Sequence, residues 1–169
     1  PQLDFEIAIP LAHADKVLEY LDDTIKARRM CLPLIGVFLR FSRDAETGLI
    51  AHSNHGPGEP VMFVEMVVYA GPEWCLDDDN MRPYVQVVST LLSQYEGRPH
   101  WGKNHEQIFR GERERVATRP VHSQGPSYQE RLARFARVAQ CLDPRGVFAT
   151  GFARAAGLRP AEGAPKPVC

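Results

Sequence analysis

The chain has 169 residues, of which 44% are hydrophobic and 24% are charged, and its formal net charge at pH 7 is -1. These values predict a globular domain with a substantial core, and they exclude a general electrostatic attraction to nucleic acid. No apolar run approaches the roughly 20 residues of a membrane span, and residues 1–10 lack the basic segment of a signal peptide.

The first seventy residues predict a strand, a helix and two further strands. Residues 5–9 alternate apolar and polar side chains, which is typical of a half-buried strand. Residues 13–29 follow the helical period, and residues 34–42 and 61–70 are apolar runs that predict strands. The apolar stripe of the helix comprises Ala14, Val17, Leu18, Leu21 and Ile25.

The second half of the chain predicts two more helices around a short final strand. Residues 77–80 (DDDN) cap a helix that Gly97 ends, and the strand begins there. Ser127 and Glu130 form a capping box that opens the last helix. The expected buried positions are Met81, Tyr84, Val85, Val88, Leu91, Leu92 and Tyr95 in one helix, and Tyr128, Leu132, Phe135, Val138 and Leu142 in the other.

This order of elements predicts an α+β fold. Two amphipathic helices joined to strands by short connections are best accommodated on one face of an antiparallel sheet, as in a ferredoxin-like split βαβ layer. A C-terminal helical segment is added to it. We therefore divide the chain into a substrate or cap domain at residues 1–110, a helical segment at 111–157 and a disordered tail at 158–169.

The four cysteines are scattered, and none forms a Cys-x-x-Cys pair. This pattern argues against a structural metal site and is typical of free thiols in a reducing compartment. We therefore expect a cytoplasmic protein with no metal.

Residues 96–107 (EGRPHWGKNHEQ) concentrate basic, imidazole and indole side chains in a short run. Taken singly, Trp101 is best explained as a packed aromatic and Lys103 as a solvated charge. Taken together, they indicate a ligand site. If the run is a strand, alternation puts His100 and Gly102 on one face and Trp101 and Lys103 on the other.

The run GRPHWGK at 97–103 is followed about forty residues later by LDPRGVF at 142–148. Together they resemble the C-terminal part of the aldonolactone oxidases, a family that is similar to alditol oxidase and other flavoproteins of the vanillyl-alcohol oxidase type. The resemblance covers most of residues 3–155. It implies oxidation of a CH–OH group of a sugar lactone, polyol or related alcohol by hydride transfer to FAD.

In that family FAD is bound mainly by an N-terminal domain with phosphate-binding loops, and this sequence has no glycine-rich phosphate cradle. The resemblance therefore implies a cap domain and a returning C-terminal segment, with the FAD domain supplied by the same protein or by a companion chain. We expect the chain alone to be inactive and to hold no FAD.

The family also carries a Glu-x-Arg pair on a central strand, aimed at the substrate. In GVFLRF at 36–41, Arg40 matches the arginine, whereas Phe38 stands where the glutamate is expected. Glu65 is the only charge in residues 61–70, so we expect it to supply the missing acid and to pair with Arg40 across adjacent strands.

The resemblance implies the following roles. Arg40 and Lys103, with Glu65, act at the reacting centre; Phe38 and Trp101 line the substrate pocket; Arg98, His100 and Lys103 lie near the flavin. The plainer alternatives are that Arg40 extends to solvent and that Glu65 faces solvent on an edge strand.

A non-enzymatic role is the alternative function. A ferredoxin-like module that has lost its flavin domain could bind a partner or a small ligand, and the altered Glu-x-Arg motif favours this alternative. Flavin absorbance of the full-length protein would distinguish the two functions.

Overall fold

A computed structural model describes residues 2–28, 36–43, 55, 58–69, 78–103, 108, 128–155 and 158. The elements in chain order are strand β1 (Gln2–Pro10), the 3-10 helix η1 (Leu11–His13), helix α1 (Ala14–Arg28), strands β2 (Val37–Arg43) and β3 (Pro60–Tyr69), helix α2 (Asp78–Gln94), strand β4 (Arg98–Pro99), and helices α4 (Tyr128–Leu142) and α5 (Gly151–Ala155). The remaining residues, including residues 43–60 in large part and the expected tail after residue 158, lie outside this description.

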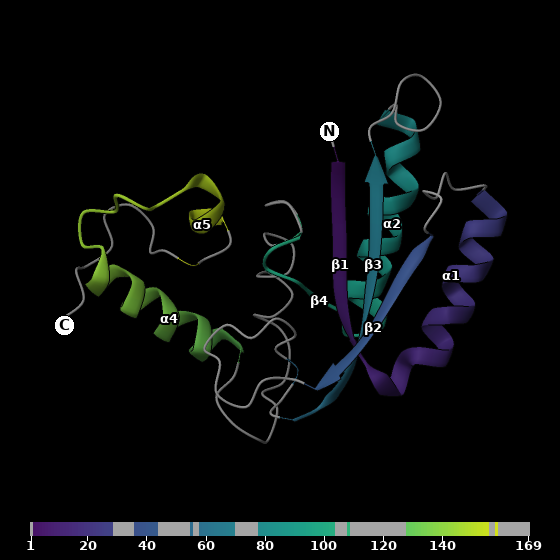
Figure 1. Ribbon diagram of the computed structural model, residues 1–169, viewed down its shortest axis with the longest axis horizontal. Helices are drawn as coiled ribbons and strands as arrows, with labels where there is room; N and C mark the ends of the chain where they lie inside the picture. The colour runs from purple at the N-terminus through teal and green to yellow at the C-terminus, as the bar shows by residue number, and fades with distance from the viewer. Residues whose placement is uncertain are drawn as a thin grey trace.

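The four strands form one sheet in the order β2-β3-β1-β4 (Figure 1). All three pairings are antiparallel. Glu65 of β3 lies opposite Glu6 of β1 on one side and opposite Phe38 of β2 on the other. Strands β1 and β3 are therefore central, and the expected antiparallel α+β layer is confirmed.

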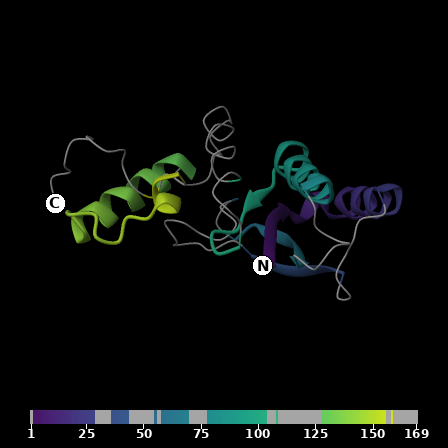
Figure 2. The ribbon, with the colours of Figure 1, turned by 90° about the horizontal axis from the view of Figure 1, so that it is seen from above.

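Helices α1 and α2 cover one face of this sheet, as Figure 2 shows from above. Alternate residues of β1 and β3 point into the core beneath them, because successive side chains of a strand face opposite sides. The buried members of this core are Phe5, Ile7, Ile9, Val17, Leu21, Met62, Val64, Met66, Tyr84, Val87, Val88, Leu91 and Leu92. The opposite face holds a small apolar cluster of Ala8, Val61 and Phe63.

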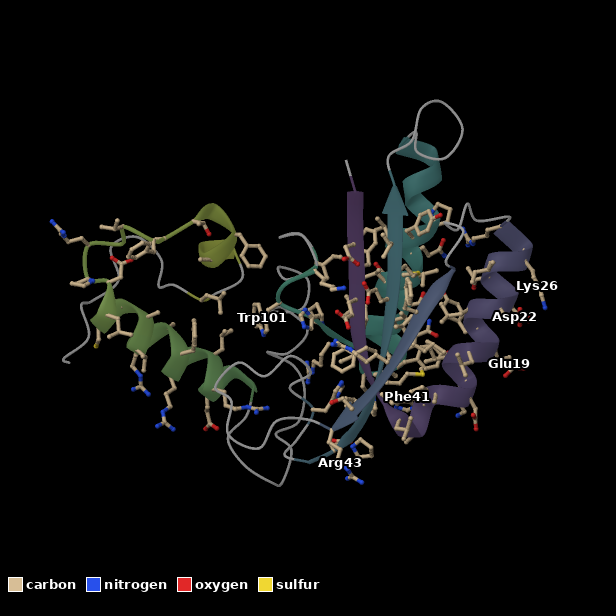
Figure 3. All side chains as sticks on the ribbon, viewed as in Figure 1. Glu19, Asp22, Lys26, Phe41, Arg43 and Trp101 are labelled. Carbon is tan, nitrogen blue, oxygen red and sulfur yellow. The ribbon has the colours of Figure 1, made fainter. Side chains whose placement is uncertain are left out.

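The predicted stripe of α1 is largely confirmed. Val17 and Leu21 are buried, whereas Leu18 is 40% exposed and was wrongly assigned to the core. Leu18 lies about 100° around the helix from Val17, at the border of the covered face. Figure 3 shows Glu19, Asp22 and Lys26 on the outer side of this helix, where the charges of an amphipathic helix belong.

Helix α2 follows its prediction with one error at the same kind of border. Tyr84, Val88, Leu91 and Leu92 are buried as expected, but Val85 is 46% exposed. The side chain of Met81 is outside the described residues. None of the described helices is long and apolar enough to cross a membrane.

The C-terminal segment keeps its predicted elements but not its predicted burial. The carboxylate of Asp143 accepts hydrogen bonds from the backbone N–H groups of Val147 and Phe148 at 2.9 and 3.0 Å, which closes a turn after α4. Leu132 is buried, but Val138 is 44% and Leu142 82% exposed, so these two core assignments are wrong for the described part of the chain.

Cys141, at the end of α4, corrects the expectation of free thiols. It is disulfide-bonded, and the other three cysteines lie outside the described residues. Cysteines that are distant in the sequence can meet in the fold, so spacing alone could not reveal this bond.

The end of α2 is packed against β1 at Gly97. Glu96 takes the left-handed conformation with φ 55°, and the N–H of Gly97 donates to the carbonyl oxygen of Leu91 at 2.9 Å. A Cβ atom at Gly97 would lie 2.6 Å from that oxygen and 2.7 Å from Cγ2 of Ile7. The glycine is therefore required by this close approach of helix and strand.

We expect Gly97→Ala to lower the free energy of unfolding by about 1–3 kcal/mol, because the added methyl group overpacks a site bounded by backbone. Urea unfolding of the variant measures this loss. Gly151→Ala is the matched control, since a Cβ atom there would meet nothing within 4 Å. Equal stability of the two variants would contradict this account of Gly97.

Candidate functional site

The sheet face opposite α1 and α2 gathers the charged side chains of the candidate site. Residues that lie opposite each other in an antiparallel sheet share a face, so Glu6, Glu65 and position 38 form one row. Arg40, Phe63 and Ala8 form the next row. The turn that follows β4 adds His100 and Lys103 at the edge of this face.

Glu6 lies at the centre of the site, and its residue is fully buried. Its Oε1 atom accepts a hydrogen bond from Nη2 of Arg40. Its Oε2 atom lies 3.8 Å from Nδ1 of His100 and 4.0 Å from Nζ of Lys103. A carboxylate removed from water needs such partners, because an uncompensated buried charge is strongly destabilising.

Lys103 lies among three carboxylates. Its ammonium donates to Oε1 of Glu65 and lies 3.5 Å from Oδ2 of Asp4, in addition to its approach to Glu6. The hydrogen bond with Glu65 is the largest cause that raises the pKa of Lys103. Burial raises the pKa of Asp4, with nearby Lys103 opposing this shift and the negative charge of Glu65 adding to it.

Arg40 is held on two sides and open on the others. Its guanidinium carbon lies 4.4 Å from the centroid of the Phe63 ring, which is a cation–π contact. Glu6 is its hydrogen-bond acceptor, and the described part of the chain gives it no second one. The side chain is 57% exposed, so its remaining N–H groups are available to a ligand.

The run after β4 is a turn, which corrects the expected alternation of residues 100–103. The strand ends at Pro99, and the N–H of Lys103 donates to the carbonyl oxygen of His100 at 3.3 Å. This turn brings Lys103 to the same side of the sheet as His100 instead of the opposite one. The N–H of His100 donates to the carbonyl oxygen of Glu6 at 2.9 Å, which ties the turn to β1.

The imidazole of His100 is best assigned as neutral. Its Nδ1 atom accepts a hydrogen bond from the N–H of Gly102 at 3.1 Å, so that nitrogen carries no proton and the proton is on Nε2. The distance of 3.8 Å from Nδ1 to Glu6 is too long for a hydrogen bond and agrees with this assignment.

The other expected site residues differ in their access to a ligand. Phe38 is 44% exposed, opposite Glu65. Trp101 is half-buried, and Figure 3 shows it beyond β4 on the side of the sheet away from α1. Arg98 is only 4% exposed on β4, so a ligand could touch little of it.

The prediction that Glu65 pairs with Arg40 is wrong. The structure places both residues on one face, as expected, but Arg40 binds Glu6 and Glu65 binds Lys103. Sequence reasoning missed Glu6, Asp4 and Phe63. The available signal was Glu6, the one charged residue in the otherwise apolar run of residues 5–9, which the prediction of a half-buried strand leaves on the uncovered face.

The described residues contain no group of three His, Cys, Asp or Glu side chains that could hold a metal ion.

Comparison with known proteins relates the chain to one family. The sequence profile of D-arabinono-1,4-lactone oxidase matches residues 1–156. L-gulono-1,4-lactone dehydrogenases from the CDC 1551 / Oshkosh and ATCC 25618 / H37Rv strains of Mycobacterium tuberculosis are each 30% identical over 152 residues. The match covers 89% of this chain and 29% of each relative, so the chain spans less than a third of their length.

The alkaline limit of stability should depend on Lys103. Because its pKa is raised above the ordinary 10.5, its ammonium adds stability that is complete below pH 10.5 and is lost as the pH rises through the folded value. Lys103→Met should lack this alkaline loss, and at neutral pH it should cost less than ~1 kcal/mol because the pair is partly solvated.

Chemical unfolding of both proteins across the alkaline range measures the difference. Lys16→Met is the control, since Lys16 is exposed on α1 and should leave the wild-type profile unchanged. A profile of Lys103→Met that coincides with that of the wild type would identify Lys103 as a simple surface charge.

Proposed function

Because the chain belongs to the D-arabinono-1,4-lactone oxidase family, we propose that it is the cap and C-terminal portion of an FAD-dependent oxidoreductase. The substrate is a sugar lactone, polyol or related alcohol, which is oxidised at a CH–OH group. The observation that carries this proposal is the paired charge cluster on the sheet face opposite the helices, with the exposed donors of Arg40 at its edge. Residues 1–110 would form the substrate domain, 111–157 the segment returning to the FAD domain, and 158–169 a tail.

The family is FAD-dependent, and a bound FAD supplies the acceptor for the hydride that leaves the carbinol carbon. Lys103 and His100 fit the flavin side of the site, because both side chains are partly exposed on the charged face. Arg98, which precedes His100 and Lys103 in the sequence, fits a supporting role because it is buried. The phosphates would be held by an FAD domain in the same protein or in a companion chain.

On the substrate side, this chain supplies hydrogen-bond donors and a pocket wall. Arg40 would donate to a substrate oxygen, and Lys103, held by Glu65, would stabilise negative charge that develops on the reacting oxygen. Phe38 and Trp101 would line the pocket and exclude water from it.

The charge count favours an uncharged substrate. Three carboxylates, Asp4, Glu6 and Glu65, surround two cations, Arg40 and Lys103. Among the described residues of this face, Arg40 and Lys103 are already paired, so a carboxylate ligand would meet no uncompensated positive charge from them and would be repelled by the third acid. A lactone or polyol would therefore be accepted, whereas the aldonate formed by opening the lactone ring would be rejected.

A non-enzymatic binding module is the second candidate. The observation that favours it is Phe38 at the position where the family pattern has a glutamate. Loss of catalytic function predicts that the full-length protein carries no reducible flavin, whereas the proposed enzyme requires one.

Anaerobic mixing of the full-length flavoprotein with an aldonolactone should bleach the flavin absorbance. Arg40→Met should slow this bleaching roughly 100-fold, as expected for loss of one preorganised donor at the reacting oxygen. Arg43→Met on the same strand is the control, because its guanidinium donates to the carbonyl oxygen of Gly58 at 3.1 Å at the end of the strand. A flavin that no lactone or polyol reduces would favour the binding module.

Charge selectivity provides a separate prediction. Glu65→Gln removes one negative charge and should lower the inhibition constant of an aldonate at least roughly five-fold, which is about 1 kcal/mol, the Coulomb energy of two unit charges ~4 Å apart at the dielectric of bulk water. Inhibition kinetics with the aldonate measure this. Glu19→Gln, on the outer side of α1 (Figure 3), changes the net charge equally and should have no effect. Equal changes in both variants would refute local charge selection.

A further inference from the structure

Arg40 owes its orientation to a residue of another strand. We propose that Glu6 is the positioning residue for Arg40, so that the acid which directs this arginine toward a substrate comes from central strand β1 and not from β2. The inference rests on the proposed function, because it concerns how Arg40 is presented to the substrate.

A long side chain on an edge strand loses conformational freedom when it must hold one geometry. Arg40 is 57% exposed, yet it is fixed at two points. Nη2 donates to Oε1 of Glu6, and the guanidinium lies over the ring of Phe63. These two contacts define both the direction and the plane of the guanidinium, which leaves its other N–H groups in one fixed array.

Glu6 is a rigid anchor because the backbone around it is paired on both sides. Strand β1 lies between β3 and β4, and the carbonyl oxygen of Glu6 itself accepts the N–H of His100 at 2.9 Å. Its carboxylate is buried, so the charge-assisted bond to Arg40 is shielded from water on the acid side and is weakened less than a fully exposed pair would be. An acid at position 38 would lie on edge strand β2, where Phe38 is 44% exposed.

The two oxygens of Glu6 serve different halves of the site. Oε1 binds Arg40, whereas Oε2 faces His100 and Lys103 at 3.8 and 4.0 Å. One carboxylate thus sets the position of the substrate-side donor relative to the turn assigned to the flavin side. Because Glu6 is fully buried, it would act through Arg40 and would not touch the substrate.

A purely structural role for Glu6 makes a different prediction. In that case Glu6→Gln would lower stability, but the folded flavoenzyme would bind and oxidise its lactone as the wild type does. The positioning role instead predicts a loss of lactone affinity that depends on the presence of Arg40.

The test is a double-mutant cycle in the full-length flavoprotein, with the lactone dissociation constant read from the change in flavin absorbance on binding. Glu6→Gln should raise this constant roughly 10-fold to 100-fold, the cost of a misplaced binding group. Glu6→Gln should add little in an Arg40→Met background, because the group that it positions is already absent. Glu65→Gln is the control, because Glu65 binds Lys103 and not Arg40. Its effect on the lactone dissociation constant should be the same in the Arg40→Met background as in the wild type.

Additive effects of Glu6→Gln and Arg40→Met, or an unchanged dissociation constant in Glu6→Gln, would overturn the proposal. If Glu6→Gln does not fold, Glu6→Asp retains the buried charge but withdraws it by one methylene group, and the same cycle applies. A wild-type protein that binds and oxidises neither a lactone nor a polyol would refute the proposed function instead, so the two failures are distinguishable.

Discussion

A carboxylate buried in the central strand of a sheet must be neutralised where it lies, and Glu6 imposes this requirement on the whole charged face. The neighbouring strand β3 offers only another acid, Glu65, in the position directly opposite. The compensating cations must therefore come from further away. They come from β2, through Arg40, and from the turn after β4, through Lys103.

The contact between Arg40 and Phe63 follows from the same constraint. Arg40 lies opposite Phe63, which in turn lies opposite Ala8, so the arginine must cross β3 to reach a carboxylate on β1. Neighbouring strands are ~4.8 Å apart, and a guanidinium that spans two such spacings has to pass over the side chain between them. The aromatic ring provides a surface over which that charge can lie.

The sequence allowed the fold to be predicted because periodicity reports which face of an element is covered. The strands of the sheet and the two helices over one face follow from that signal. It fails at the borders of a stripe, as at Leu18 and Val85, because burial there depends on the exact position of a neighbouring element. It also fails for Val138 and Leu142, since an apolar stripe does not say what covers it.

The site was predicted only as far as local pattern allows. The expected pairing of adjacent strands put Arg40 and Glu65 on one face, and the structure confirms that β2 and β3 are neighbours. Their partners could not be predicted, because they depend on which strand lies on the far side of β3, and that is a property of the sheet order β2-β3-β1-β4. The prediction that residues 100–103 continue a strand was wrong, because β4 ends at Pro99 after two residues and the alternation of side chains does not extend into the turn that follows.

The sheet explains how Arg40 can function although the Glu-x-Arg motif lacks its glutamate. Position 38 shares one row of the sheet with Glu65 and Glu6. A glutamate at position 38 would therefore add a third carboxylate to this row, whose two acids are already paired with Arg40 and Lys103. Like charges directly opposite each other destabilise a sheet. An apolar Phe38 relieves that repulsion, while Glu6 binds the arginine from two strands away. A motif that is broken along one strand can thus be complete across the face of the sheet. Phe38 in place of the acid is therefore compatible with a functional Arg40. This compatibility removes the main reason to favour the non-enzymatic binding module.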